Sequence, residues 1–462
     1  MKLKYLPLLI FSMVLLVSCK EEGKQEDKLI AENRAETQKL SEAELLDTVQ
    51  MQTLKYFWDF AEPNSGMARE RYHPDGNYPK NDKHVVTTGG SGFGLMAIVA
   101  GVERGFIPKD SALARLNKIA DFLDAAPRFH GAWSHWLNGE TGDVQAFGEK
   151  DNGGDIVETS FLAQGFIVVR EYLKNGTEEE KAVAAKYDKL WKGIEWNWYT
   201  NNKDGIYWHW SPEYEWEMDF MIEGYNECLI TYVLAASSPE YAIDADAYHK
   251  GWARSGNIKT DAEAYGFPLI LKHNTRGNMG GPLFWAHYSY LGLNPKGLSD
   301  RYANYWDLNR NHTLINYEYT LEYADSVDTY SENSWGLTAS YTRNKDNSTG
   351  YTAHSPDNDR KVVSPTAAIS SIPYTPEKSL AAMRYFFEEQ NDLLWGPAGF
   401  YDAFSLEDEP WVTKKYLAID QGPMVVMIEN YRSGLIWDLF MQAPEVQNGL
   451  KKLDFQFSNQ KI

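Results

Sequence analysis

The chain has 462 residues, of which 43% are hydrophobic and 14% aromatic, and its net charge is -20. This acidic balance argues against a nucleic-acid partner, because binding to phosphates needs a basic surface. The length and the hydrophobic content are sufficient for one large domain with its own core.

The first forty residues are typical of an export signal followed by a tether. Lys2 and Lys4 precede an apolar run over 6–17 that is too short to span a membrane, and a lipobox ends at Cys19. We expect a lipoprotein signal peptide over 1–18 and acylation of Cys19; the alternative is an ordinary signal peptide with an incidental cysteine. Cys228 then has no partner for an intrachain disulfide.

Residues 19–40 are charged and poor in large apolar side chains. Such a segment cannot bury enough surface to offset its chain entropy, so we expect an acylated, charged tether. The predicted location is the bacterial envelope, with the lipid anchor in the outer membrane and the protein on its periplasmic or cell-surface face.

Beyond residue 40, apolar residues recur at helical spacing, and no strand-like alternation competes with it. In the first segment, Leu46, Val49, Phe57 and Phe60 fall on one stripe. Helices are predicted over 42–60, 93–102, from 111 onward, and over 156–172, 178–196, 220–236, 283–291, 376–390 and 423–440.

The segments between these helices are rich in glycine and aromatic residues. Many helices joined by aromatic loops favour an all-α fold of helical hairpins, the (α/α)6 toroid, over a simple bundle with short connections. No linker interrupts the body of the chain, so we expect a single domain over 41–462. We also expect the protein to be a monomer.

Asp151, Asp155 and Glu158 flank Gly153 and Gly154 where a helix is expected to begin. Asp155 and Glu158 have the spacing of a capping box, which is the structural alternative. A cap leaves Asp151 and the two glycines unexplained. We therefore favour three carboxylates that a loop presents to a cleft.

Three further acidic residues could belong to such a site. Glu223 and Glu227 are four residues apart in an apolar segment, a spacing that would place both on one helix face, although they could equally face solvent. Asp420 precedes Gly422 and could either cap a helix or enter the site. Glycosidic cleavage usually needs two carboxyl groups, one protonated and one ionised.

Aromatic rings in loops can stack on sugars. The candidate substrate-binding residues are Trp133, Trp136, Tyr207, Trp208, Trp210, Trp216, Trp285, Trp335 and Tyr401. His135 and His209 stand among them and are given no catalytic role. No spacing of metal ligands appears, so neither metal nor cofactor is expected. The glycine-rich segment 89–94 indicates the start of a helix at which the backbone can pass close to another part of the structure or to a ligand.

Several segments, taken in order, resemble the glucoamylase-like domain of glycoside hydrolase family 144: 88–94, 155–159, 276–282, 331–336, 364–368, 399–404 and 420–423. The resemblance implies an (α/α)6 barrel that hydrolyses β-1,2-glucan with inversion and without a metal, either internally or by releasing sophorose. It also implies that the essential acidic residues are Asp151, Asp155, Glu158, Glu227 and Asp420.

Two other functions remain open at this point. A hydrolase of the same fold could act on another glucan such as starch, or a surface lipoprotein could bind β-glucan without cleaving it. An intact acidic cluster favours the hydrolase.

Overall fold

The computed structural model describes residues 39–346 and 348–457. The expected signal peptide, Cys19 and the tether up to residue 38 lie outside the described residues. The chain divides into two compact units, 1–47 and 48–462. Helix α2 (Glu42–Trp58) begins in the first unit and ends in the second, and all later elements belong to the second. Among the described helices, none has the length and apolar character needed to cross a membrane.

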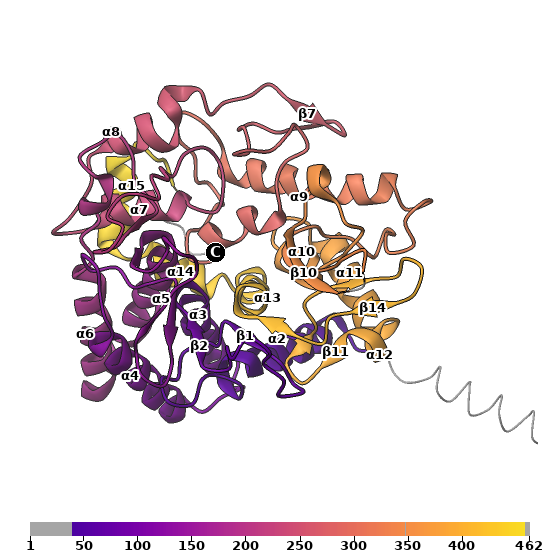
Figure 1. The fold of residues 1–462 in the computed structure, drawn as a ribbon, viewed down its shortest axis with the longest axis horizontal. Coiled ribbons are helices and arrows are strands. Elements are labelled where there is room, and N and C mark those ends of the chain that lie inside the picture. Colours follow the sequence, from indigo (N-terminus) through magenta and orange to yellow (C-terminus); the bar gives the residue numbers. More distant parts are fainter. Residues whose placement is uncertain (1–38, 347, 458–462) are drawn as a thin grey trace, which may run out of the picture. The chain divides into compact units, whose positions relative to one another are not determined.

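The second unit is rich in helices, which confirms the helical character predicted from the sequence (Figure 1). The α-helices are α3 (Thr88–Glu103), α4 (Lys109–Ala125), α5 (Ile156–Leu173), α6 (Glu178–Lys192), α7 (Leu229–Ser237), α8 (Ala245–Ala247), α9 (Tyr305–Glu322), α10 (Pro365–Ser370), α11 (Pro376–Glu388), α12 (Asn391–Leu394), α13 (Ala418–Arg432), α14 (Leu435–Met441) and α15 (Pro444–Lys452).

Inner and outer helices differ in the residues that they bury. Helices α3 and α5 are buried along nearly their whole length. Helix α4 buries a single stripe, as expected for a helix with one face toward the core: Ala112, Leu116, Ile119, Ala120 and Leu123. Figure 1 shows α4 and α6 at the edge, with α3 and α5 inside them.

The inner elements contact one another in a closed series. Helix α3 packs on α5, α5 on α7, α10 on α13, and α13 on α3. Two 3-10 turns, η4 (Leu283–Ala286) and η5 (Tyr288–Tyr290), connect α7 to α10. Ile230 N of α7 donates to Ser289 Oγ at 3.1 Å on one side, and Nε2 of His287, between the two turns, lies 3.0 Å from Oγ of Ser371, the C-cap of α10, on the other. Inner elements thus alternate with the outer helices along the chain.

The close packing of α3 on α5 depends on Gly92. A Cβ atom at this position would lie 2.2 Å from the backbone oxygen of Phe161, which cannot move without displacing α5. The glycine-rich entry predicted from the sequence therefore serves helix–helix approach. A short strand, β2 (Val85–Thr87), precedes it.

Gly92→Ala should destabilise the protein by about 1–3 kcal/mol, because an added methyl group overpacks this contact. The measurement is the free energy of unfolding in denaturant. Gly101→Ala is the control in the same helix, because its Cβ would meet the movable end of the Leu54 side chain. Equal stability of Gly92→Ala and the wild type would contradict the observed α3–α5 contact.

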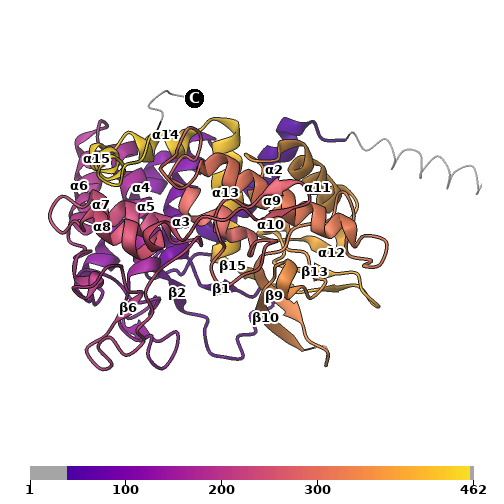
Figure 2. The ribbon, with the colours of Figure 1, turned by 90° about the horizontal axis from the view of Figure 1, so that it is seen from above.

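The strands are short and antiparallel, and Figure 2 shows β2, β6, β9 and β10 on one side of the helices. They pair as follows: β1 (Arg71–Tyr72) with β15 (Tyr416–Leu417), β2 with β3 (Trp136–Asn138) and β3 with β4 (Val144–Gln145), β5 (Gly154–Asp155) with β6 (His209–Trp210), β7 (Glu263–Ala264) with β8 (Phe267–Pro268), β9 (Ala339–Arg343) with β10 (Thr349–Ala353), β11 (Trp395–Gly396) with β12 (Gly399–Phe400), and β13 (Phe404–Ser405) with β14 (Trp411–Val412).

Three of the predicted helices differ from the structure. The segment 220–228 is irregular, with Gly224 at φ +75°, so α7 begins only at Leu229. The segment 283–291 forms 3-10 turns, and the last predicted helix is interrupted at Gly434, which has φ +71°. Helix α9 was missed because it buries mainly polar and aromatic side chains, among them Asn309 and His312, and so lacks an apolar period.

Candidate active site

Asp155 is the N-cap of α5, and its two carboxylate oxygens have different partners. Oδ1 accepts the backbone N–H groups of Val157 and Glu158, both at 2.9 Å. Oδ2 accepts Nδ1–H of His135 at 2.8 Å and Nε1–H of Trp208 at 2.9 Å. Because this buried carboxylate satisfies four donors, it fixes the start of α5 and also orients two side chains of the site.

Asp155 caps the helix, as the structural alternative predicted, but Glu158 does not complete a capping box. Its Oε2 accepts the backbone N–H of Gly89 at 2.9 Å, whereas the N–H of Asp155 donates to the backbone oxygen of Trp133. A Cβ atom at Gly89 would lie 2.5 Å from Oε2, so the glycine is needed for this contact. Burial raises the pKa of Glu158, and the nearby charge of Asp155 adds to the effect.

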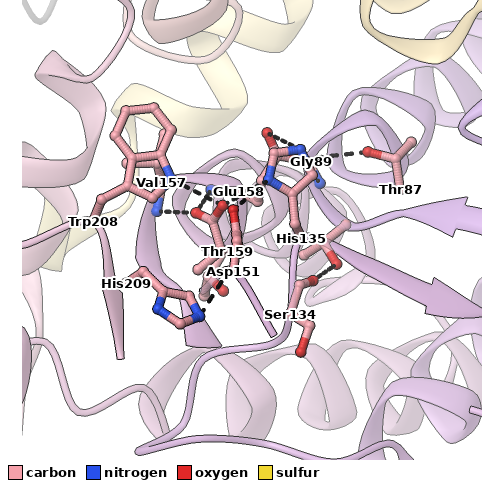
Figure 3. A network of polar contacts seen from close by, with 12 residues as sticks. Thr87, Gly89, Ser134, His135, Asp151, Val157, Glu158, Thr159, Trp208 and His209 are labelled. Atoms are coloured by element: carbon pink, nitrogen blue, oxygen red, sulfur yellow. Dashed lines mark hydrogen bonds and ion pairs between the residues drawn. The ribbon is translucent and has the colours of Figure 1, made fainter. Parts of the chain in front are cut away.

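Asp151 points into the same cluster (Figure 3). Its Oδ1 has no hydrogen-bond partner among the described residues and lies 3.7 Å from His209 Nε2. That nitrogen already accepts the N–H of Gly153 at 2.9 Å, so it carries no proton for Asp151. Burial and the charge of Asp155 raise the pKa of Asp151 to about 7.

The two glycines beside this carboxylate have a structural reason. A Cβ atom at Gly153 would lie 2.3 Å from the backbone oxygen of Trp210, and one at Gly154 would lie 2.1 Å from Tyr199 Oη. Strand β5 can therefore pair with β6 only if both positions lack a side chain. This pairing places Asp155 opposite His209.

His135 lies between the carboxylates. Its Nδ1 is 3.8 Å from Asp151 Oδ2, and its Nε2 is 3.9 Å from Glu158 Oε1, in addition to the bond with Asp155. Burial disfavours the charged ring, but the charges of these three carboxylates outweigh burial and raise the pKa of His135 to about 9. The ring therefore supplies a positive charge to the acidic cluster, a role that the sequence did not indicate.

His135, Asp151 and Asp155 also offer atoms within 4.8 Å of one another, the spacing of a possible metal group. However, Nδ1 of His135 donates its proton to Asp155, and a metal ligand must be an unprotonated nitrogen. The chemistry of these donors therefore fits an ion pair better than a ligand set.

Glu227 completes the cluster from the loop before α7. Burial raises its pKa to about 7, and the charges of Glu158 and Asp155 contribute. Glu223 does not join it, because the segment is not helical; its carboxylate instead pairs with Arg254 at 2.8 Å. The predicted helical Glu223–Glu227 pair is wrong, whereas Glu227 itself lies with the other carboxylates.

Asp420 belongs to a second acidic pair. It lies in the first turn of α13, and its carboxyl is affected by the charge of Asp402, which is also buried. Burial, followed by the charge of Asp402, raises the pKa of Asp420 well above its usual value. Burial raises the pKa of the Tyr288 hydroxyl, and the charge of Asp420 adds to this effect. Asp420 does not cap the helix, because its oxygens accept no backbone N–H among the described residues.

Two adjoining cavities meet at the first cluster. One, of about 340 Å³, is lined by Glu158, and the other, of about 610 Å³, by Asp151. The residues common to both linings are His135, Phe147, Trp208, Glu227 and Phe284. We call the two cavities together the cleft; Glu227 lies at their junction. A separate cavity beside β9 and β10 has no aromatic lining residue.

Three of the nine predicted sugar-binding residues line the cleft: Trp136 in the smaller cavity, Trp285 in the larger one, and Trp208 in both. Trp133 and Trp335 are fully buried in the core. A buried indole cannot contact a sugar, so the prediction for these two residues is wrong.

The other four predicted residues line neither cavity. Trp210 and Trp216 pack around Trp198, and Tyr207 packs on Trp216. Tyr401 packs on Tyr416 with ring centroids 5.1 Å apart. These four rings therefore pack on other aromatic side chains and are not part of the cleft lining.

The sequence analysis also missed residues that line the cleft. Six aromatic side chains were not singled out, although one of them stands two residues before the acidic segment 149–158: Phe147, Phe161, Phe220, Phe284, Tyr288 and Tyr351. Asp402, the partner of Asp420, lies in the segment 399–404 and could have been noted as an acidic residue there.

Residues 219–444 match a family model described as "Putative glucoamylase". A curated relative, the exo beta-1,2-glucooligosaccharide sophorohydrolase (non-reducing end) of Parabacteroides distasonis, is 43% identical over 438 residues. The match covers 91% of this chain but only 59% of that protein, so the chain spans less than two thirds of its relative's length.

Two solved structures are also similar to this chain. The endo-beta-1,2-glucanase from Chitinophaga pinensis, in complex with sophorotriose and glucose, superposes with a TM-score of 0.88 at 59% identity over 90% of this chain and 99% of that one. The beta-1,2-glucanase from Parabacteroides distasonis superposes with a TM-score of 0.82 at 40% identity, over 90% of this chain and 60% of that one.

The sequence and the fold that this chain shares with these relatives are those of glycoside hydrolases. The chain belongs to glycoside hydrolase family 144, the family with the glucoamylase-like domain, as its sequence motifs implied.

Proposed function

We propose that this protein hydrolyses β-1,2-linked glucan in the cleft. The observation that carries the proposal is the position of Glu227, a carboxyl with a pKa of about 7 at the junction of two sugar-sized, aromatic-lined cavities. The 59% identity to an endo-beta-1,2-glucanase supports this linkage. No feature of the cleft favours starch.

Glu227 is our choice for the general acid. A carboxyl with this pKa keeps its proton in mildly acidic solution and can give it to the leaving oxygen. Asp155 satisfies four donors and therefore acts by positioning. Water activation then falls to Glu158, which lines the smaller cavity, to Asp151, which lines the larger one, or to Asp420, which follows Ile419 of the smaller cavity in the chain.

We further propose that cleavage is internal to the chain. The cleft continues on both sides of Glu227, with exposed Tyr351 in one cavity and exposed Phe220 in the other, so a glucan can extend in both directions. A time course on linear β-1,2-glucan should give early products of mixed length. Release of sophorose alone from the start would instead indicate exo action. Proton NMR of fresh products should show α-anomers if the configuration inverts.

The fold that we propose for the catalytic unit is the (α/α)6 toroid. The closed series of inner elements, α3, α5, α7, η4 with η5, α10 and α13, supports it, because each contacts the next directly or at its cap residue. The proposed catalytic domain remains 41–462.

Export and anchoring follow from the first residues. We expect Cys19→Ser to release the protein from membranes while its specific activity stays the same, since the tether separates the lipid from the cleft. The measurement is the distribution between membrane and soluble fractions after fractionation of the host cell. Retention of the variant on membranes washed with salt and carbonate would contradict the anchor.

A further inference from the structure

Three exposed hydrophobic side chains gather in the cleft. Phe147, Phe220 and Tyr351 are 54%, 47% and 53% exposed. Tyr351 lines the smaller cavity, Phe220 the larger one, and Phe147 both. Large apolar side chains that are grouped and exposed indicate a surface that binds something, and Phe147 is the one at the junction.

The ring of Phe147 is held in a fixed orientation. It stacks on the His135 ring with centroids 4.1 Å apart and planes 17° apart, and it meets Trp136 edge to face at 4.9 Å. The turn that carries it is closed by Phe147 N donating to Asp151 O at 3.0 Å. One face therefore covers His135, while more than half of the side chain remains open to the cleft.

We propose that Phe147 is the stacking platform for the glucose unit next to the cleaved bond, and so a residue that determines how the glucan lies across Glu227. This inference rests on the proposed function. A β-glucose ring has its hydroxyls equatorial and presents C–H groups on its faces, which suit an aromatic ring. The backbone bond to Asp151 links the platform to the acidic cluster.

The test compares Phe147→Ala, Phe147→Leu and Phe147→Tyr on β-1,2-glucan. Loss of stacking in the alanine variant should raise KM about tenfold or more. Leucine keeps an apolar side chain over His135 but has no flat face, so it should resemble alanine. Tyrosine restores the ring and should stay within about threefold of the wild type.

Trp198→Ala is the matched control. Trp198 stacks on His130 at 3.6 Å and is 39% exposed, so it has a similar setting, but it lines neither cavity. Its KM should not change. A wild-type KM for Phe147→Ala, or full function of Phe147→Leu, would overturn the platform.

A binding measurement separates this inference from the proposed function. In Glu227→Gln, the fluorescence of Trp136 and Trp208 should respond to β-1,2-gluco-oligosaccharides, and adding Phe147→Ala should weaken that response about tenfold or more in Kd. If the wild type binds these sugars without cleaving them and Phe147→Ala still weakens binding, hydrolysis is wrong, while Phe147 remains a residue that stacks on the sugar. If binding does not depend on Phe147, the platform is wrong whatever the activity.

Discussion

Glu227→Gln should lower kcat on β-1,2-glucan by about 100-fold to 10,000-fold, the scale of general acid–base assistance. Glutamine has nearly the same shape but no proton to give to the leaving oxygen. Because burial raises the pKa of this carboxyl to about 7, the protonated form predominates below that pH, and the neutral amide replaces it without a new buried charge. The melting temperature should therefore change little. Steady-state kinetics beside calorimetry make the measurement.

Glu223→Gln is the control four residues earlier. Its carboxylate pairs with Arg254 and lines neither cavity, so turnover should be retained. Glu158→Gln, Asp151→Asn and Asp420→Asn should identify the water-activating residue. We expect one of them to lower kcat by about 100-fold or more, as Glu227→Gln does. Retention of more than about half of the turnover by all of these variants would place the chemistry elsewhere, since a proton-transfer group is worth far more.

Asp155→Asn should behave differently, with losses of both stability and activity. The amide has one acceptor oxygen where the carboxylate satisfies four donors with two. It could still cap α5, but its NH2 group would then face the N–H groups of His135 and Trp208.

His135→Gln should destabilise the protein by about 3–5 kcal/mol, because it removes the positive partner of buried carboxylates. The folded-state pKa of about 9 is above the ordinary value of 6.5. The stabilisation is therefore fully present below pH 6.5 and is lost as the pH rises through 9. The difference in melting temperature between wild type and variant should be large at pH 6 and small at pH 10.

The same variant should shift the activity profile to higher pH. The charge of His135 lowers the pKa of Glu158 and of Asp151, so its loss lets both rise further. His130→Gln is the control, because that ring pairs with Glu195 away from the cleft. An unchanged pH profile in active His135→Gln would show that the charge of the ring does not act on the carboxyls that control activity.

Much of the fold follows from apolar periodicity. Helical spacing predicted a helix from 111 onward, and α4 is observed there, with a buried stripe that includes Leu116, Ile119 and Leu123. Periodicity fails where polar side chains are buried, as in α9, and where a backbone turn decides the outcome, as at Gly224 and Gly434. Such positions depend on contacts with distant segments, which local sequence does not describe.

The site could be predicted only where its residues lie close together in the sequence. Spacing placed Asp151, Asp155 and Glu158 together, because they lie at one helix start. It could not identify Glu227 over Glu223, since the choice depends on an irregular loop. Nor could it give His135 a charge, because that charge arises from three carboxylates brought together only by the fold. Aromatic residues near glycines proved a poor guide, as the buried Trp133 and Trp335 demonstrate.

The most direct test incubates the purified protein with linear β-1,2-glucan, laminarin and starch and follows product sizes by chromatography. We expect only β-1,2-glucan to be shortened, with Glu227→Gln inactive under the same conditions. Cleavage of starch or laminarin without cleavage of β-1,2-glucan, or binding of β-1,2-glucan without any cleavage, would contradict the proposed function.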